Sequence, residues 1–231
     1  MTDIVRYELR DGVALLSFDD GRANAVSHSA IDALNGALGR AEKEAGAAVL
    51  SGRPGRFSAG FDLSVINQGI DASRALVTAG GELLVRIVES DVPVVAACSG
   101  HALAMGALML LASDYRVGAR GAFKIGLNEV AIGLTLPVFA LELARARIAR
   151  QHLARATNLA EVYDPDGALA AGYLDRVVAP EQLEAEALAA AVQLSKLNRA
   201  AYRGTKRKLF GAMAQHIRAT LAQDMAGWTT P

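Results

Sequence analysis

Apolar and polar residues alternate at the start of the chain, and a helical spacing of apolar residues takes over further along. Residues 4–9 and 13–18 alternate around an Asp-Gly turn, a pattern typical of a β-hairpin. Apolar residues then recur every three or four positions up to Glu44, which predicts a helix capped by Ser27 or Ser29. The same reasoning predicts strands at 47–50, 92–98, 115–117, 122–124 and 174–178, and a loop at 51–57. It predicts helices at 73–89, 102–112, 141–153, 168–171, 180–194 and 198–225.

Residues 92–112 are nearly all apolar, and this length is close to that of a membrane-spanning helix. However, Pro93 lies near the start of the stretch, and Ser99, Gly100 and His101 interrupt it. The first part is rich in β-branched and small residues, whereas the second is rich in Ala, Leu and Met. The break therefore favours a buried strand followed by a buried helix over a membrane span.

The order of the predicted elements indicates the fold class. Strands and helices alternate up to about residue 135, which predicts an α/β region of stacked short strands at 1–135. From Pro137 the pattern becomes mainly helical, so 136–231 is predicted to be a helical C-terminal region. That region would form either a smaller subdomain or an oligomerisation element.

Composition limits the classes of function. The chain has 231 residues with 24 Lys+Arg and 24 Asp+Glu, so it exerts no net electrostatic attraction on nucleic acid or anionic lipid. Cys98 is the only cysteine, which excludes an intrachain disulfide, and its apolar neighbours predict a packed thiol. The histidines lie far apart without metal-ligand spacing. The first residues lack the apolar run of a signal peptide, which predicts a cytoplasmic protein.

Two stretches rich in small residues carry the candidate chemistry. Residues 56–63 and 99–106 each place Gly and Ala where a strand gives way to a loop or helix. Small side chains let a ligand approach the backbone closely, and an N–H at a helix N-terminus carries the positive end of the helix dipole. Two such N–H groups from separate loops could together hold one oxyanion, although either stretch alone is more typical of simple packing. Neither matches a phosphate-binding loop, because Phe61 and Asp62 stand where Lys and Ser/Thr are required.

Taken together and in order, four segments resemble the crotonase (enoyl-CoA hydratase/isomerase) superfamily. Phe57-Ser-Ala-Gly-Phe-Asp-Leu63 is similar to the first oxyanion-hole motif of that family, and residues 99–106 to the second. Residues 123–133 resemble the segment that carries the catalytic glutamate, and residues 19–25 the turn that contacts coenzyme A. The resemblance implies a crotonase-like (ClpP/crotonase) fold of stacked β-β-α units with a helical C-terminal trimerisation region.

The resemblance also implies a role for individual residues. The N–H groups of Phe61 and Met105 match the two oxyanion donors, and Glu129 matches a family glutamate. Leu108 falls where hydratases carry a second glutamate, which is the most informative departure. Met105 stands where the family usually has glycine, which puts a side chain beside the thioester. The positions that match substrate-binding residues are Arg22, Ala23, Ala59, Gly60, Asp62, Leu63, Gly106 and Leu108.

The implied chemistry is stabilisation of a thioester enolate. Removal of the α-proton of an acyl-coenzyme A puts negative charge on the carbonyl oxygen, which two backbone N–H groups would hold. Burial of Glu129 among Ile125, Val130 and Ile132 would raise the pKa of its carboxyl and make it a better base. An exposed turn carboxylate is the alternative that the neighbouring residues alone leave open.

Three functions are consistent with this resemblance. With Leu108 in place of a second acid, the chain is predicted to shift a β,γ double bond to α,β with Glu129 as sole acid/base. The alternatives are hydration of an α,β-enoyl-CoA and a non-catalytic acyl-CoA-binding or structural subunit.

The partner is an acyl-CoA thioester, whose coenzyme A belongs to the substrate, so no separate cofactor or metal is expected. By resemblance the protein forms a trimer or a dimer of trimers. The basic residues Arg199, Arg203, Lys206, Arg207 and Lys208 would form a solvated face or meet coenzyme A phosphates.

Overall fold

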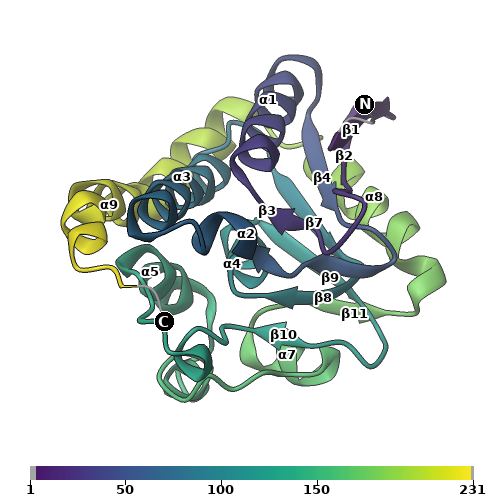
Figure 1. Cartoon of the computed structure of the whole chain (residues 1–231). Helices are drawn as coiled ribbons and strands as arrows, with labels where there is room; N and C mark the ends of the chain where they lie inside the picture. Colours follow the sequence, from purple (N-terminus) through teal and green to yellow (C-terminus); the bar gives the residue numbers. More distant parts are fainter. Residues whose placement is uncertain (1–3, 230–231) are drawn as a thin grey trace.

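The fold is built on a six-stranded sheet with helices on both faces (Figure 1). The computed structural model describes residues 4–229. Strands lie in the order β1-β2-β4-β7-β9-β11; only β1 and β2 pair antiparallel, and the later pairs are parallel. The strands of this sheet are β1 (Val5–Arg10), β2 (Val13–Phe18), β4 (Ala47–Ser51), β7 (Val94–Cys98), β9 (Tyr115–Ala119) and β11 (Arg176–Val178).

Two small sheets lie beside the large one and carry the glycine-rich segments. β8 (Gly100–Leu103) pairs in parallel with both β5 (Gly55–Ser58) and β10 (Ile125–Gly126). β3 (Ala25–Val26) pairs in parallel with β6 (Gly60–Phe61). β5 follows β4, β8 connects β7 to α4 (Met105–Ala112), and β3 and β6 lead into α1 (His28–Glu44) and α2 (Leu63–Ile66).

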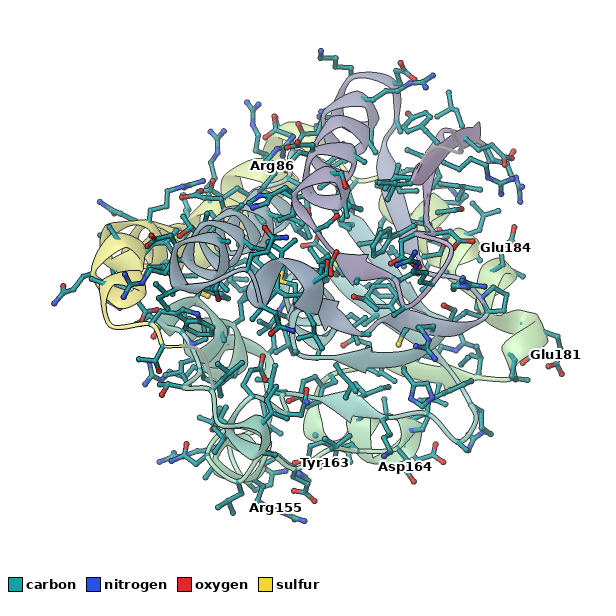
Figure 2. All side chains as sticks on the ribbon, viewed as in Figure 1. Arg86, Arg155, Tyr163, Asp164, Glu181 and Glu184 are labelled. Carbon is teal, nitrogen blue, oxygen red and sulfur yellow. The ribbon has the colours of Figure 1, made fainter. Side chains whose placement is uncertain are left out.

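Helices cover both faces of the large sheet. α1 (His28–Glu44) packs on the N-terminal strands, and Ser27 caps it by accepting a hydrogen bond from the Ala30 amide. α3 (Ile70–Val88) and α4 (Met105–Ala112) lie on the same side as α1, and α2 (Leu63–Ile66) packs on α3. α8 (Leu183–Leu194) covers the opposite face, where Glu184 lies next to the hairpin and pairs with Arg10 at 2.9 Å (Figure 2).

The C-terminal region contributes to the large sheet and to the helices that pack beside it. Its remaining elements are α5 (Val138–Arg147), α6 (Leu153–Ala156), α7 (Pro165–Ala171), α9 (Arg199–Ala226) and a short 3₁₀ turn at Pro180–Gln182, while another 3₁₀ turn, Val130–Ile132, precedes the region. β11 completes the large sheet, whereas α9 packs on α3 and α5. Burial of Ala214, Ile217, Leu221 and Met225 therefore holds much of the long last helix against its own chain.

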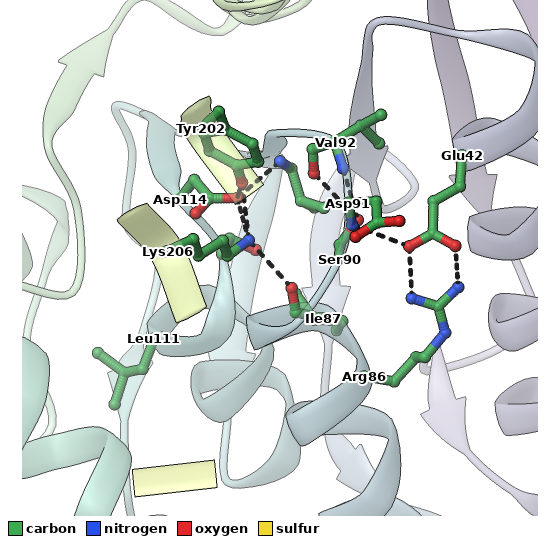
Figure 3. A network of polar contacts seen from close by, with 12 residues as sticks. Glu42, Arg86, Ile87, Ser90, Asp91, Val92, Leu111, Asp114, Tyr202 and Lys206 are labelled. Atoms are coloured by element: carbon green, nitrogen blue, oxygen red, sulfur yellow. Dashed lines mark hydrogen bonds and ion pairs between the residues drawn. The ribbon is translucent and has the colours of Figure 1, made fainter. Parts of the chain in front are cut away.

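A buried ion pair anchors the first half of α9 (Figure 3). Lys206 Nζ lies 2.8 Å from Asp114 Oδ2, and the Lys206 side chain is only 6% exposed. The Tyr202 hydroxyl and the Val94 amide also donate to the same carboxylate oxygen. Since an unpaired buried charge is costly, this shared acceptor fixes α9 against the turn after α4. Lys206 is thus an internal residue, and for this member of the basic cluster the solvated-face alternative is wrong.

The structure corrects several predicted boundaries. The predicted loop 51–57 contains the start of β5, and the predicted helix 102–112 begins only at Met105 because its first residues pair as β8. The strand expected at 122–124 lies instead at Ile125–Gly126, and the helix expected at 141–153 ends at Arg147. Short buried strands and buried helices share the same apolar composition, so only pairing with a neighbour separates them. In residues 4–229, no helix is long and apolar enough to span a membrane.

Candidate active site

The loop before α2 holds the amide of Phe61. The Asp62 amide donates to the Val26 carbonyl at 3.1 Å. Successive amides of an extended strand point to opposite sides, so the Phe61 N–H points away from β3. Buried Asn24 stabilises this loop, because its side-chain amide donates to the carbonyls of Phe18 and Phe57 while the Ser58 hydroxyl donates to its backbone oxygen.

The amide of Met105 opens helix α4. As the first helical residue it has no intrahelical acceptor for its N–H. The preceding Ala104 adopts φ 49° and ψ −120°, a conformation that is unfavourable for a residue with a Cβ. The Ala104 amide donates to the Gly126 carbonyl at 3.0 Å, which ties this turn to β10. A strained backbone held by its surroundings is a common feature of functional sites.

Close packing around two glycines brings the two loops together. A Cβ on Gly60 would lie 3.3 Å from the Leu103 carbonyl oxygen and 3.7 Å from the Met105 nitrogen. A Cβ on Gly106 would lie 2.4 Å from the Ser58 carbonyl oxygen. Position 106 needs glycine because backbone meets backbone there, and position 60 favours glycine because its φ is +105°. The two candidate donors therefore lie on adjoining segments.

A third glycine, which the sequence pattern did not indicate, supports the same region. A Cβ on Gly80 of α3 would lie 2.4 Å from the Phe61 ring and 3.5 Å from the methyl carbon of Met105. The Phe61 ring thus packs directly on the backbone of α3, and Met105 fills the space beside it. A side chain at position 80 would displace the ring and with it the loop that carries the Phe61 amide.

Glu129 follows β10 and is 7% exposed. Since β10 pairs with β8, the segment that leads to Glu129 runs alongside the turn that presents Met105. Its Oε2 atom is buried and has no hydrogen-bond partner among the described residues. Burial raises the pKa of the Glu129 carboxyl to about 7, because the charged form loses hydration. A carboxyl with this pKa can take up or release a proton near neutral pH.

An open cavity of about 500 Å³ begins at the residue after Glu129. It is largely apolar, and its lining consists of Val130, Gly133, Leu134, Thr135, Leu136, Leu141 and Asn158. Val130 and Ile132 are 44% and 47% exposed. The prediction that these two residues bury Glu129 is therefore wrong, because the 3₁₀ turn at 130–132 presents them outward. Ile125, the third residue of that prediction, is fully buried, as is Leu127.

Comparison with known proteins identifies the chain. The family model for enoyl-CoA hydratase/isomerase matches residues 8–229. The chain belongs to the enoyl-CoA hydratase/isomerase family. Human mitochondrial enoyl-CoA delta isomerase 1 is 32% identical over 93% of this chain and 72% of its own length. A probable enoyl-CoA hydratase from Bacillus subtilis is 33% identical over 55% of this chain and 50% of its own length.

Solved structures of the enoyl-CoA hydratase/isomerase family share the fold. A family protein from Pseudomonas syringae superposes with a TM-score of 0.96 at 43% identity, covering 99% of both chains. An enoyl-CoA isomerase from Mycobacterium tuberculosis superposes at 0.93 with 38% identity, covering 98% of this chain and 100% of its own. Human mitochondrial delta3-delta2-enoyl-CoA isomerase superposes with a TM-score of 0.92 at 30% identity, covering 96% of this chain and 89% of its own. The predicted α/β crotonase-like fold is thereby confirmed.

The predicted substrate-binding residues occupy both buried and exposed positions. Gly60, Gly106 and Leu108 are buried, and Leu108 is only 1% exposed on α4. Asp62 caps α2 by accepting from the Ser64 amide, so it orders the loop. Arg22, Ala59 and Leu63 are exposed, and Ala23 is half-buried, so these four remain accessible to a ligand. Residues that the sequence pattern missed are Asn24, Gly80 and Ala104, whose importance depends on backbone geometry.

Replacing Ala104 by glycine is expected to stabilise the protein. Removing Cβ at φ 49° relieves strain worth roughly 1–3 kcal/mol, whereas the extra flexibility of the unfolded chain costs about 0.5–1 kcal/mol. The net gain should appear as a higher melting temperature in thermal unfolding. Ala102→Gly, in the same segment but within β8, is the control and should lower the melting temperature.

Glu129 is expected to make stability depend on pH. Its folded-state pKa of about 7 lies above the unfolded value, so protonated Glu129 favours folding and this contribution is lost as pH rises through 7. The full loss, on the order of 3 kcal/mol, accumulates from the ordinary value of 4.5 to above pH 7, and roughly 1.4 kcal/mol of it falls between pH 6 and 8.5. Chemical denaturation of wild type and Glu129→Gln at pH 6 and 8.5 measures this last part. An equal pH response in both proteins would contradict the expectation.

Proposed function

We propose that the chain is an enoyl-CoA isomerase that shifts a β,γ double bond to the α,β position, with Glu129 as the single acid/base. The observation that carries this proposal is the buried carboxylate of Glu129, whose Oε2 atom has no partner among the described residues, together with the apolar Leu108 on α4. Hydration requires one group to activate water and another to deliver a proton. Leu108 can do neither.

The proposed reaction uses the two backbone donors and the carboxylate in turn. The thioester carbonyl oxygen accepts from the N–H groups of Phe61 and Met105. Glu129 removes a proton from the α-carbon, and the electron pair forms the dienolate whose charge the two donors stabilise. One such donor typically contributes about 3–4 kcal/mol to the transition state. The protonated carboxyl then delivers the same proton to the γ-carbon, the double bond moves to α,β, and Glu129 is again ionised.

The accessible residues around the site suggest how the substrate lies. Arg22, Ala23, Ala59 and Leu63, which match the substrate-binding positions, border the loop that holds Phe61 and would contact the coenzyme A portion. The apolar cavity next to Glu129 would receive the acyl chain beyond the reacting carbons. Coenzyme A enters as part of the substrate, and no further cofactor takes part in this reaction.

The test is a direct comparison of two reactions. Purified protein is incubated with matched β,γ- and α,β-unsaturated acyl-CoAs, and the products are separated by chromatography and mass. The expected result is conversion of the β,γ to the α,β isomer without gain of water. Faster hydration of the α,β substrate would support the hydratase alternative, and binding without turnover would support a non-catalytic acyl-CoA-binding role.

Assembly and location are proposed from the same family relationship. We propose a trimer, or a dimer of trimers, formed through the helical C-terminal region and acting in the cytoplasm. Exposed Leu197 and Leu209, at 49% and 69%, border a cavity of about 410 Å³ on α9 and favour contact with another subunit. A purely monomeric sedimentation profile at micromolar concentration would oppose the assembly proposal.

A further inference from the structure

Ser58 lies at the end of β5, just before the loop that carries the Phe61 amide, and it is completely buried. Its hydroxyl donates to the Asn24 carbonyl oxygen at 2.7 Å. The same hydroxyl accepts from the Gly60 amide at 3.2 Å. A hydroxyl has one donor and two acceptor sites, so both bonds form together. The Ser58 side chain therefore ties the turn at Asn24 to the residue that precedes Phe61.

The turn on the Asn24 side of this link is held by its own hydrogen bonds. The Asp20 carboxylate accepts from the Arg22 amide at 2.7 Å. It also accepts from the amides of Asn24 and Ala25, each at 2.8 Å. The Asn24 side-chain amide in turn donates to the Phe18 carbonyl at 2.8 Å. The Asn24 oxygen that accepts from Ser58 is thus part of a closely bonded turn.

On the other side of the link, the amides before and after that of Phe61 are both engaged. The Gly60 amide donates to Ser58, and the Asp62 amide donates to the Val26 carbonyl at 3.1 Å. Because a peptide group is planar, the direction of the Phe61 N–H depends on the backbone torsions next to it. Gly60 has φ 105° and, as a glycine, rotates easily unless hydrogen bonds hold it. The Ser58 hydroxyl therefore limits rotation directly beside the first candidate donor.

Ser58 also packs against the segment that carries the second candidate donor. A Cβ on Gly106 would lie 2.9 Å from the Ser58 Cβ atom, so the two residues are in close contact. Gly106 follows Met105 in the first turn of α4. One buried residue thus contacts both segments of the candidate oxyanion hole, and its hydroxyl joins the first of them to the turn at Asn24.

We propose that Ser58 is a positioning residue whose hydroxyl holds the Phe61 N–H in the direction of the thioester oxygen. This inference rests on the proposed function, which assigns the amides of Phe61 and Met105 as oxyanion donors. In this role Ser58 neither touches the substrate nor exchanges a proton with it. Donors stabilise developing charge best when their direction is fixed before the reaction. Loss of the hydroxyl should weaken the hydrogen bond from Phe61 while leaving the amide in place.

Ser58→Ala tests the proposal, with Ser113→Ala as the matched control. Ser113 is equally buried, and its hydroxyl donates to the Met109 carbonyl at 2.8 Å at the opposite end of α4 from Met105. Each variant loses a buried hydroxyl, so both should lose stability. In Ser58→Ala, kcat should fall roughly tenfold with KM unchanged, a part of the about 10²–10³-fold cost of losing an oxyanion donor. Ser113→Ala should keep the wild-type kcat and KM.

The carbonyl stretching band of a bound saturated acyl-CoA gives a readout that needs no turnover. Carbon-13 at the thioester carbonyl identifies the band in infrared difference spectra, and hydrogen bonds to its oxygen move the band to lower frequency. The band should lie below that of the free thioester in wild type and in Ser113→Ala. In Ser58→Ala it should return part of the way toward the free thioester, an effect that a purely structural role of the hydroxyl would not produce.

The two measurements separate this inference from the proposed reaction. A lower band in wild type than in Ser58→Ala supports the role of Ser58 even if wild type shows no isomerase activity, which would refute the reaction alone. If Ser58→Ala does not fold, Ser58→Cys takes its place, since a thiol is a weaker donor and acceptor, and its band should likewise lie between wild type and free thioester. A band at the wild-type position in the variant that folds, or an equal change in Ser113→Ala, overturns the inference.

Discussion

Glu129→Gln is expected to lower turnover of a β,γ-enoyl-CoA by at least about a hundredfold, because general acid–base catalysis typically contributes about 10²–10⁴-fold. Glutamine keeps the volume of the side chain but cannot accept the α-proton. Binding should survive, since the proposed contacts with the thioester oxygen come from backbone amides. Steady-state kinetics give the turnover, and calorimetric titration with a saturated acyl-CoA gives the affinity.

Glu142→Gln is a suitable control for this change. Glu142 lies on α5, pairs with Arg145 and is not part of the proposed site. This variant should keep wild-type turnover and affinity. Retention of activity by Glu129→Gln would refute the role of Glu129 as sole acid/base. Loss of both turnover and affinity would show that the residue shapes the site and does not carry the proton.

Met105→Pro is expected to lower turnover strongly, chiefly through the loss of one backbone N–H. Proline at the first position of a helix is well tolerated, so α4 itself should persist. The missing N–H removes one oxyanion donor, an effect of about 10²–10³ in turnover. The strained Ala104 before it adds to the loss, because proline restricts the preceding residue. Turnover is measured beside far-ultraviolet circular dichroism, which reports whether the helices are retained.

Met105→Leu is the control that retains the amide. It conserves volume and hydrophobicity in a fully buried position and should stay within severalfold of wild type. Where proline unfolds the protein, replacement of the Met105 amide by an ester removes the N–H with little change of shape. Activity within tenfold of wild type in the ester variant would show that the Met105 N–H is not an oxyanion donor.

Local patterns in the sequence were sufficient for most of the helices and for the strands of the large sheet. The hairpin at residues 4–18 and the cap at Ser27 depend on alternation and on one hydroxyl, so neighbours in the chain determine them. β5, β8 and β10 could not be placed in the same way. Each is two to four residues long and exists only through pairing with segments distant in the chain.

The same distinction between local pattern and tertiary contact applies to the candidate site. Resemblance to family motifs, in their order and spacing, predicted roles for Phe61, Met105 and Glu129. Burial of Glu129 did not follow from Val130 and Ile132, which turn outward, although the preceding Ile125 is buried as predicted. Gly80 lies on a helix with no motif of its own, and only packing places it beside Phe61. The sequence by itself thus predicted which groups react. The tertiary structure decided their environment, because hydration and hydrogen bonding depend on contacts between distant segments.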